Sequence, residues 1–275
     1  MRIARLQLSD GSITLARQHA GGNFTRLSGD LFGTLGDTGE AVNGKLLAPL
    51  QPAAILCIGL NYKKHAAETN KPEPKFPVVF MKLPGAVQNP GDPILLPRRM
   101  RSNAVDYECE LAVVIGKTAK NVSRYPALNH VLGYTCANDV SARDWQEHGG
   151  GGQWCRGKTF DTFCPLGPVL VTPDEITDPQ SLKIATRVNG EALQDWNTND
   201  MIFDIATIIE FLSSSTTLLP GTVIITGTPH GVGMARIPRR WLVPGDICEI
   251  EIEKIGVLSN KVEEEQATEG TFRVG

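Results

Sequence analysis

The sequence predicts a mainly β protein of the α+β class, in which strands dominate and helices are few. From residue 53 onward, short runs rich in β-branched residues alternate with turns that contain proline and glycine. Two segments carry the apolar spacing or the capping signal of a helix. With 275 residues, 41% of them hydrophobic and 21% charged, the chain can bury a substantial core.

The first 50 residues differ in composition from the rest. They are rich in glycine, threonine and aspartate, as in the segment SGDLFGTLGDTGEAVNG. This pattern favours short strands and turns. We therefore expect a small N-terminal β-rich lobe over residues 1–50 and a larger domain over residues 51–275.

The larger domain is expected to contain eight strand-like runs and two helices. The runs cover residues 53–62, 76–83, 105–116, 131–139, 167–172, 182–190, 222–227 and 246–256. One helix is expected over residues 62–70, with Asn61 as its N-cap. The other is expected over residues 203–214, with an apolar face made of Ile205, Ile208, Ile209 and Leu212. The stretch from 262 to 270 is expected to be a solvated acidic tail.

Composition argues against several classes of partner and compartment. A net charge of −3 gives no electrostatic basis for binding nucleic acid or an anionic membrane surface. No apolar run approaches the roughly 20 residues that a membrane-spanning helix needs. The six cysteines are scattered without a CxxC pair, which favours buried, reduced thiols. The first residues, MRIARLQLSDGS, alternate like a strand and lack a secretory signal. We therefore expect a cytoplasmic protein.

The stretch VDYECELAVVIG, residues 105–116, contains an unusual group of acids. Successive side chains of a strand point to opposite faces. One face of this run carries Asp106, Glu108, Glu110, Ala112 and Val114. A solvated edge strand is one explanation. The apolar continuation of the same face, with no interleaved lysine or arginine, favours a partly buried cluster instead.

Buried carboxylates on neighbouring positions need a compensating charge. Residues two apart on a strand lie about 6.6 Å apart, and two unit charges at that distance repel by roughly 2–3 kcal/mol at an effective dielectric constant of about 20. Such a cluster must protonate, find cationic partners or bind a metal. Oxygen ligands alone favour Mg²⁺, Mn²⁺ or Ca²⁺.

A further acid and a cation are candidates for the same site. Asp139 follows the expected strand 131–137, although Asn-Asp at this point is also typical of a plain turn. Lys158 lies between Gly157 and Phe160 at the start of an apolar region, so a buried ammonium group near the acids is reasonable.

Six motifs in this order resemble the fumarylacetoacetate hydrolase family over about residues 50–265. The similarity is greatest to the branch that contains fumarylacetoacetate hydrolase domain-containing protein 2. The motifs are GLNYKKHAAE, VDYECELAVVIGK, NDVSARDWQ, GKTFDTFCPLGP, RVNGE and TGTPHGVG. The resemblance implies a mixed β-roll with a small N-terminal region, and a homodimer.

The resemblance also implies a set of metal ligands. In this family a divalent metal, commonly Mg²⁺ or Mn²⁺, is held by the two glutamates of the Glu-x-Glu strand and the aspartate of the Asn-Asp motif. These positions correspond to Glu108, Glu110 and Asp139. Asp106 matches a common family residue but is not expected to be a ligand.

The remaining motifs imply catalytic and substrate-binding residues. His65 and Glu68 match a catalytic pair, and their spacing places them on one face of the expected helix. Lys158 matches a lysine that lies against the substrate. Positions that commonly touch substrate correspond to Arg143, Gln146 and Thr228. In the loop TGTPHGVG, we expect backbone N–H groups and the Thr228 hydroxyl to meet a substrate carboxylate.

These residues predict an enzyme that acts on 2-oxo acids through a metal-bound enolate. The first hypothesis is hydrolysis of a C–C bond in an acylpyruvate-like 2,4-dioxo acid. The alternative is tautomerisation or decarboxylation of oxaloacetate at the same site. A third hypothesis, of another class, is a protein that binds metal and organic acids without turnover, but such a protein needs no proton-transfer pair.

Overall fold

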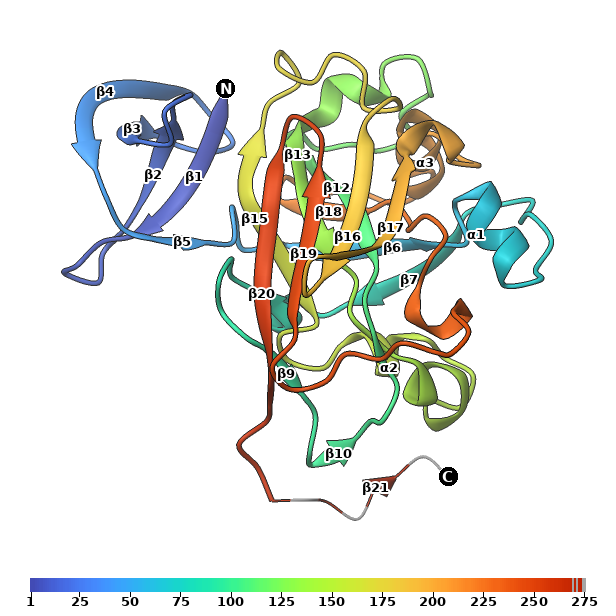
Figure 1. Cartoon of the computed structure of the whole chain (residues 1–275). Coiled ribbons are helices and arrows are strands. Elements are labelled where there is room, and N and C mark those ends of the chain that lie inside the picture. Colours follow the sequence, from blue (N-terminus) through green and yellow to red (C-terminus); the bar gives the residue numbers. More distant parts are fainter. Residues whose placement is uncertain (269, 271, 274–275) are drawn as a thin grey trace.

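Two β-sheets face each other across a shared core, and the helices are few and short (Figure 1). The computed structural model describes residues 1–268, 270 and 272–273. Among these residues, the larger sheet has twelve strands and the smaller sheet has five. The predicted mainly β class with mixed sheets is confirmed.

The larger sheet runs in the order β4-β3-β2-β1-β15-β13-β12-β18-β6-β7, with β5 paired to β1 and β8 paired to β15. Its strands are β1 (Arg2–Gln7), β2 (Ile13–Gln18), β3 (Phe24–Gly29), β4 (Leu35–Val42), β5 (Lys45–Leu47), β6 (Ala54–Gly59), β7 (Val78–Lys82), β8 (Val87–Gln88), β12 (Cys109–Ile115), β13 (Val131–Asn138), β15 (Cys164–Val171) and β18 (Thr222–Ile225). Strands from both halves of the sequence therefore meet at β12, in the middle of the sheet.

The smaller sheet runs in the order β17-β16-β19-β20-β9. Its strands are β9 (Ile94–Leu96), β16 (Lys183–Val188), β17 (Glu191–Asn197), β19 (Ile247–Ile252) and β20 (Gly256–Glu264). Two further pairs join β10 (Met100–Arg101) to β21 (Phe272–Arg273) and β11 (Val105–Asp106) to β14 (Ser141–Ala142). The helices are α1 (Lys63–Glu68), α2 (Cys155–Lys158) and α3 (Ile205–Ser213), with a π-helix over Trp145–Gly149 and short 3₁₀ segments at Pro84–Ala86, Ala127–His130, Thr198–Asp200 and Gly233–Ala235.

The N-terminal strands β1 to β4 lie to one side of the main body (Figure 1). β1 is the point of attachment, because it pairs antiparallel with β15 through Arg2–Val171 and Ile3–Leu170. The larger sheet is therefore continuous across residue 50. The division of the chain into a lobe over residues 1–50 and a domain over 51–275 stays a prediction.

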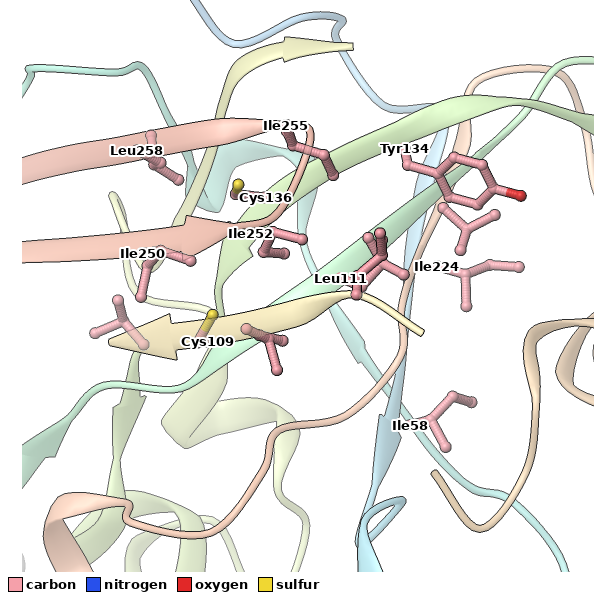
Figure 2. Packing of buried hydrophobic residues seen from close by; sticks show 14 of the residues in the cluster. Ile58, Cys109, Leu111, Tyr134, Cys136, Ile224, Ile250, Ile252, Ile255 and Leu258 are labelled. Carbon is pink, nitrogen blue, oxygen red and sulfur yellow. The ribbon is translucent and has the colours of Figure 1, made fainter. Parts of the chain in front are cut away.

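The two faces of β12 contribute to two different parts of the core. Leu111, Val113 and Ile115 belong to the cluster between the two sheets, whereas Ala112 and Val114 belong to a second cluster on the other face. Figure 2 shows Leu111 beside apolar side chains of the smaller sheet. The alternation predicted for this strand is confirmed, and it directs the even-numbered acids away from the inter-sheet core.

The expected strand over residues 105–116 is interrupted, which the sequence pattern did not predict. β11 ends at Asp106 and β12 begins at Cys109. At the break, the N–H of Tyr107 donates to the Asp106 carboxylate and the N–H of Glu108 donates to the side-chain oxygen of Asn138. These side-chain acceptors replace ladder partners, so the chain changes its pairing from β14 to β13.

Both expected helices form, but Asn61 does not cap the first. α1 begins at Lys63 after Tyr62, with no side-chain cap. The buried amide of Asn61 instead bonds the backbone of Phe203 and the carbonyl of Thr226, which ties the start of α1 to two other segments. α3 has its four expected apolar residues buried and Asp204 as its N-cap.

Three other sequence expectations can be compared directly with the structure. All six cysteines are free, and five are buried while Cys155 is half-buried. None of the helices in the described ranges is long and apolar enough to cross a bilayer. The expectation of a solvated tail from residue 262 is wrong at its start, because β20 continues to Glu264 and Val262 is fully buried. Residue 269 of that tail lies outside the described residues.

Candidate active site

Three carboxylates lie together where β12 begins and β13 ends. One oxygen atom from each of Glu108, Glu110 and Asp139 lies within 4.8 Å of the others, and all three residues are buried. The register explains this proximity, because Cys109 pairs with Asn138 and the N–H of Asp139 donates to the carbonyl of Glu108. The antiparallel ladder therefore brings Asp139 beside the two glutamates.

Two cations occupy both oxygens of Glu108. The Lys158 ammonium nitrogen lies 2.7 Å from Glu108 Oε2 and 2.9 Å from Asp139 Oδ2. The guanidinium of Arg143 lies 2.6 Å from Glu108 Oε1. Lys158 and Arg143 are themselves buried, so these ion pairs are shielded from water.

A third buried cation, Lys82 of β7, was not assigned a role from the sequence. Its ammonium nitrogen lies 2.7 Å from Asp139 Oδ1. Its hydrogens donate to the backbone carbonyls of Val140, Lys158 and Phe163, at 3.0, 2.6 and 2.7 Å. Lys82 therefore joins the two segments that carry Asp139 and Lys158.

The carboxylates of the cluster are not equally neutralised. Burial raises the pKa of Glu110 well above its ordinary value, and the nearby Asp139 and Glu108 carboxylates raise it further. Burial alone would raise the pKa of Glu108 too, but Arg143 and Lys158 hold it below its ordinary value. Lys158 has a raised pKa, because the Asp139 and Glu108 carboxylates outweigh the effect of burial. Glu110 is thus the acid least compensated by protein cations.

This donor set fits a hard divalent cation. In this buried region of the described chain, four carboxylates face three cationic side chains. The carboxylates are Asp106, Glu108, Glu110 and Asp139, and the cations are Lys82, Arg143 and Lys158. Asp139 Oδ1 is buried and accepts no hydrogen bond from any described residue, although the Lys82 ammonium nitrogen lies 2.7 Å from it. Oxygen donors with residual negative charge are the ligands that Mg²⁺ and Mn²⁺ prefer.

His65 and Glu68 form a pair on α1. Their side chains meet at 2.7 Å between His65 Nδ1 and Glu68 Oε1. The second oxygen of Glu68 accepts the backbone N–H of Gly231 at 2.8 Å. The glutamate is therefore held from both sides, and the imidazole keeps Nε2 for another partner.

Backbone N–H groups of the loop over residues 226–233 donate hydrogen bonds to carboxylates of the protein itself. The N–H of Gly227 donates to Glu110, and the N–H of Gly233 donates to Asp106 at 2.7 Å. Because these N–H groups are already used, they cannot bind a substrate carboxylate as the sequence analysis expected. Their role in this structure is to hold the carboxylates that line the site.

The Thr228 hydroxyl, which was expected to meet a substrate carboxylate, hydrogen-bonds within the protein instead. It donates to the carbonyl of Cys109 at 3.0 Å and accepts a hydrogen bond from the Gln194 amide at 2.8 Å. A hydroxyl has one hydrogen, so it has no donor left for a substrate. The backbone N–H of Thr228 has no partner within the described ranges and remains available.

Arg143 and Gln146 follow β14, and Gln146 lies in the π-helix. Arg143 contacts Asp106 through Nε at 2.9 Å and through Nη2 at 2.8 Å, and Nη1 donates to Gln146 Oε1 at 3.0 Å. With Nη2 also donating to Glu108, three of the five guanidinium N–H groups are used in hydrogen bonds and at most two remain free. The Gln146 Nε2 group has no partner among the residues described, so it is the less committed of the two donors.

One cavity of about 250 Å³ connects most of these residues. The sequence-predicted residues that line it are His65, Glu68, Glu108, Glu110, Arg143, Gln146, Lys158 and Thr228. Asp139 lies behind them, completely buried. Ile58, Phe80 and Trp154 supply apolar walls. The cavity thus places the proton-transfer pair and the acidic cluster in front of the same small ligand.

Two side chains that support the site, Lys82 and Gln194, were not predicted from the sequence. Lys82 alternates with Phe80 along β7, and Phe80 is buried, so period-two spacing could have indicated a lysine on an inward face. Gln194 accepts from the N–H of Cys109 and the Thr186 hydroxyl and is 1% exposed. Its strand, EALQDWN, mixes polar and apolar residues without regular alternation, so no local signal marked it.

The sequence closely resembles that of animal enzymes. It is 51% identical over 221 residues to the mitochondrial oxaloacetate tautomerase of Xenopus laevis. The aligned residues make up 80% of this chain and 69% of the relative. It is also 51% identical over 217 residues to a Homo sapiens enzyme of the same name, which is 78% of this chain and 68% of the relative.

These relatives contradict the cytoplasmic location expected from the sequence. Both relatives are named mitochondrial, and neither is named cytoplasmic. The expectation rested on reduced cysteines and on the absence of a secretory signal in the first residues. Reduced cysteines are as compatible with a mitochondrion as with the cytosol, so they do not distinguish the two.

The fold and the family model agree. The structure of fumarylacetoacetate hydrolase from the psychrophile Exiguobacterium antarcticum matches with a TM-score of 0.87 and 36% identity, covering 96% of this chain and 100% of that chain. The model of the fumarylacetoacetate (FAA) hydrolase C-terminal region matches residues 54–263. The β-roll expected from the resemblance is therefore confirmed, and the chain belongs to the fumarylacetoacetate hydrolase family.

Proposed function

We propose that this protein is a divalent-metal-dependent enzyme that tautomerises oxaloacetate between its enol and keto forms. The observation that carries the proposal is the single cavity of about 250 Å³ that holds both the His65–Glu68 pair and the acidic cluster. The names of the frog and human relatives favour this reaction over the hydrolysis that the sequence analysis placed first.

Mg²⁺ or Mn²⁺ is the proposed cofactor, with Ca²⁺ as an alternative, and Glu108, Glu110 and Asp139 are its proposed ligands. When bound, the cation supplies Lewis-acid polarisation of the keto oxygen and an anchor for the adjacent carboxylate. The raised pKa of Glu110 supports this assignment, because it indicates a carboxylate that protein cations leave under-compensated. Asp139 Oδ1 pairs with Lys82 but accepts no hydrogen bond from the described residues, so it can also serve as a ligand.

His65 is the proposed proton carrier. Conversion of the enol to the keto form removes a proton from the oxygen on C2 and adds one at C3. Glu68 orients the imidazole through Nδ1, so Nε2 is the ring atom available to exchange a proton with C3. Lys158 lines the same cavity and can stabilise negative charge that develops on the C2 oxygen.

The substrate's distal carboxylate is assigned to Gln146 and Arg143. The free Nε2 group of Gln146 and the remaining N–H groups of Arg143 supply donors on one wall of the cavity. The backbone N–H of Thr228 supplies a third donor. These groups favour a small dicarboxylic acid over an uncharged ligand.

Hydrolysis of a C–C bond in an acylpyruvate is the second candidate. An imidazole oriented by a glutamate can activate water as readily as it moves a proton. The structural match to a fumarylacetoacetate hydrolase supports this alternative. The same pair argues against a protein that only binds organic acids, because binding alone does not require it.

A substrate panel distinguishes the two reactions. Purified protein with Mg²⁺ is expected to accelerate loss of enol absorbance from oxaloacetate and to leave acylpyruvates intact. Catalysed cleavage of an acylpyruvate, with no effect on the oxaloacetate equilibration rate, would favour the hydrolase instead. Heat-denatured protein with the same Mg²⁺ controls for catalysis by the free metal ion.

A homodimer is the proposed assembly. β7 is an edge strand of the larger sheet within the described chain, and it exposes Val79 and Met81, followed by Leu83. An apolar edge of this kind favours burial against a second copy. Light scattering is expected to give twice the chain mass of 29.8 kDa, and a mass equal to one chain would contradict the dimer.

A further inference from the structure

Lys158 differs from the other buried cations in what it binds. In the part of the chain that the structure describes, both hydrogen bonds of its ammonium group go to proposed metal ligands, Glu108 and Asp139. Lys82 also pairs with Asp139, but its three hydrogen bonds go to backbone carbonyls, which fix it in place. Arg143 is fixed by Asp106 and Gln146 in addition to Glu108.

This arrangement leaves Glu108 with no uncommitted oxygen. Arg143 holds Oε1 at 2.6 Å and Lys158 holds Oε2 at 2.7 Å. For Glu108 to give an oxygen to a divalent cation, one of these contacts must open or be shared. Arg143 has partners outside the ligand set that keep it in place, so the contact to Lys158 is the one that can be exchanged.

Lys158 lines the cavity, so its ammonium group can move into it from the carboxylates. The ring of Phe80 also lines the cavity, and the ammonium nitrogen already lies 5.0 Å from its centroid, within the range of a cation–π contact. An ammonium group and a divalent cation sharing the same carboxylates would also repel each other strongly in a buried site. This repulsion favours movement of Lys158 toward the cavity when a metal binds.

We propose that Lys158 is an exchangeable internal cation of the metal site. It neutralises Glu108 and Asp139 in the metal-free protein, and it leaves them for the substrate cavity when a divalent cation binds. The proposal rests on the proposed function, because it requires the metal to bind these carboxylates. It makes metal binding a condition for presenting the lysine to the substrate.

Lys158→Met tests the competition directly, because methionine keeps a side chain of similar length without the charge. We expect Mn²⁺ to bind the variant at least about tenfold more tightly than the wild type in a calorimetric titration, since the internal competitor is gone. Lys120→Met is the matched control, because Lys120 is exposed and lies outside the site. The control should bind Mn²⁺ as the wild type does.

Equal or weaker Mn²⁺ binding by Lys158→Met than by the wild type would overturn the exchange while leaving the metal-dependent enzyme intact. No Mn²⁺ binding to the wild type would overturn both proposals. The two failures are therefore distinguishable.

A second measurement uses the unmodified chain, in case the variant does not fold. In protein labelled with ¹⁵N at the lysine ammonium groups, addition of Mg²⁺ is expected to shift the Lys158 signal or to abolish its protection from solvent exchange. The Lys82 signal should stay in place, because its hydrogens bind backbone carbonyls. A Lys158 signal unchanged at saturating Mg²⁺ would refute the exchange.

Discussion

Replacing Glu110 with glutamine is expected to lower the turnover of oxaloacetate by a factor of about 1,000 or more, because the least compensated ligand of the proposed metal site is lost. Glutamine has nearly the same shape and can still accept the N–H of Gly227. The change therefore removes a charge without removing the contact that positions the side chain.

The same variant should bind metal weakly and yet be more stable without it. At a Mn²⁺ concentration 1,000 times the wild-type Kd, binding stabilises the folded state by about 4.1 kcal/mol, and a 100-fold loss of affinity leaves about 1.4 kcal/mol. Without metal, the raised pKa of Glu110 means that its ionised form destabilises the fold at neutral pH. Removal of that charge should raise the melting temperature. This gain in melting temperature should vanish at a pH below the ordinary pKa of a glutamate, because wild-type Glu110 is then protonated in both the folded and the unfolded chain.

Thermal unfolding with and without Mn²⁺ measures both effects. Glu263→Gln is a suitable control, because Glu263 is an exposed residue of β20 away from the cavity. A Glu110→Gln protein with wild-type metal affinity would refute the assignment of this residue as a ligand.

Replacing His65 with asparagine is expected to lower kcat by a factor of about 100 to 10,000, the usual contribution of a positioned general acid–base group. Asparagine can keep a hydrogen bond to Glu68 in place of His65 Nδ1 but has no equivalent of Nε2. The affinity for Mn²⁺ should remain within about twofold of the wild-type value, because His65 is not among the proposed ligands.

Comparison of the change in kcat with the change in Mn²⁺ affinity distinguishes a proton-transfer role of His65 from a structural one. Initial rates with oxaloacetate report kcat, and calorimetry reports the Mn²⁺ affinity. His130→Asn, in a 3₁₀ segment outside the cavity, should change neither. A parallel loss of kcat and of metal affinity in His65→Asn would instead indicate that the histidine supports the structure of the site.

The sequence predicted β12 well because the period-two spacing of its residues reports burial directly, but no expected run covers β9, β17 or most of β20. The alternation from Cys109 to Ile115 sorted the residues of β12 correctly between two apolar clusters. The same rule failed at Tyr107 and Glu108, where side chains of Asp106 and Asn138 accept hydrogen bonds in place of the ladder. Period-two spacing contains no information about such local competition.

The acids of the site were predictable for a related reason. Repulsion between neighbouring carboxylates on one buried face indicated a cation before any family was considered. Asp139, however, became a strong candidate only through the resemblance, since Asn-Asp after a strand is also typical of a turn. The structure brings Asp139 beside Glu108 and Glu110 through the register of β12 and β13, a long-range pairing that local sequence does not encode.

The hydrogen-bond partners of individual donor groups were the hardest feature to predict. The loop TGTPHGVG was expected to bind substrate, yet the N–H of Gly231 holds Glu68 and the Thr228 hydroxyl bonds within the protein. Each of these partners is at least 100 residues distant in sequence. Which hydrogen bonds a donor makes depends on that three-dimensional neighbourhood, and the composition of the loop alone leaves it open.

We propose that the acidic cluster and the His65–Glu68 pair form one metal-dependent active site for a 2-oxo acid. The enol-to-keto rate of oxaloacetate, measured with metal-stripped protein before and after Mg²⁺ is added back, tests this proposal. We expect the stripped protein to be inactive and activity to return in proportion to bound Mg²⁺, saturating at one ion per chain. A stripped protein that retains its full rate, or a rate that Mg²⁺ does not restore, would contradict a metal-dependent active site.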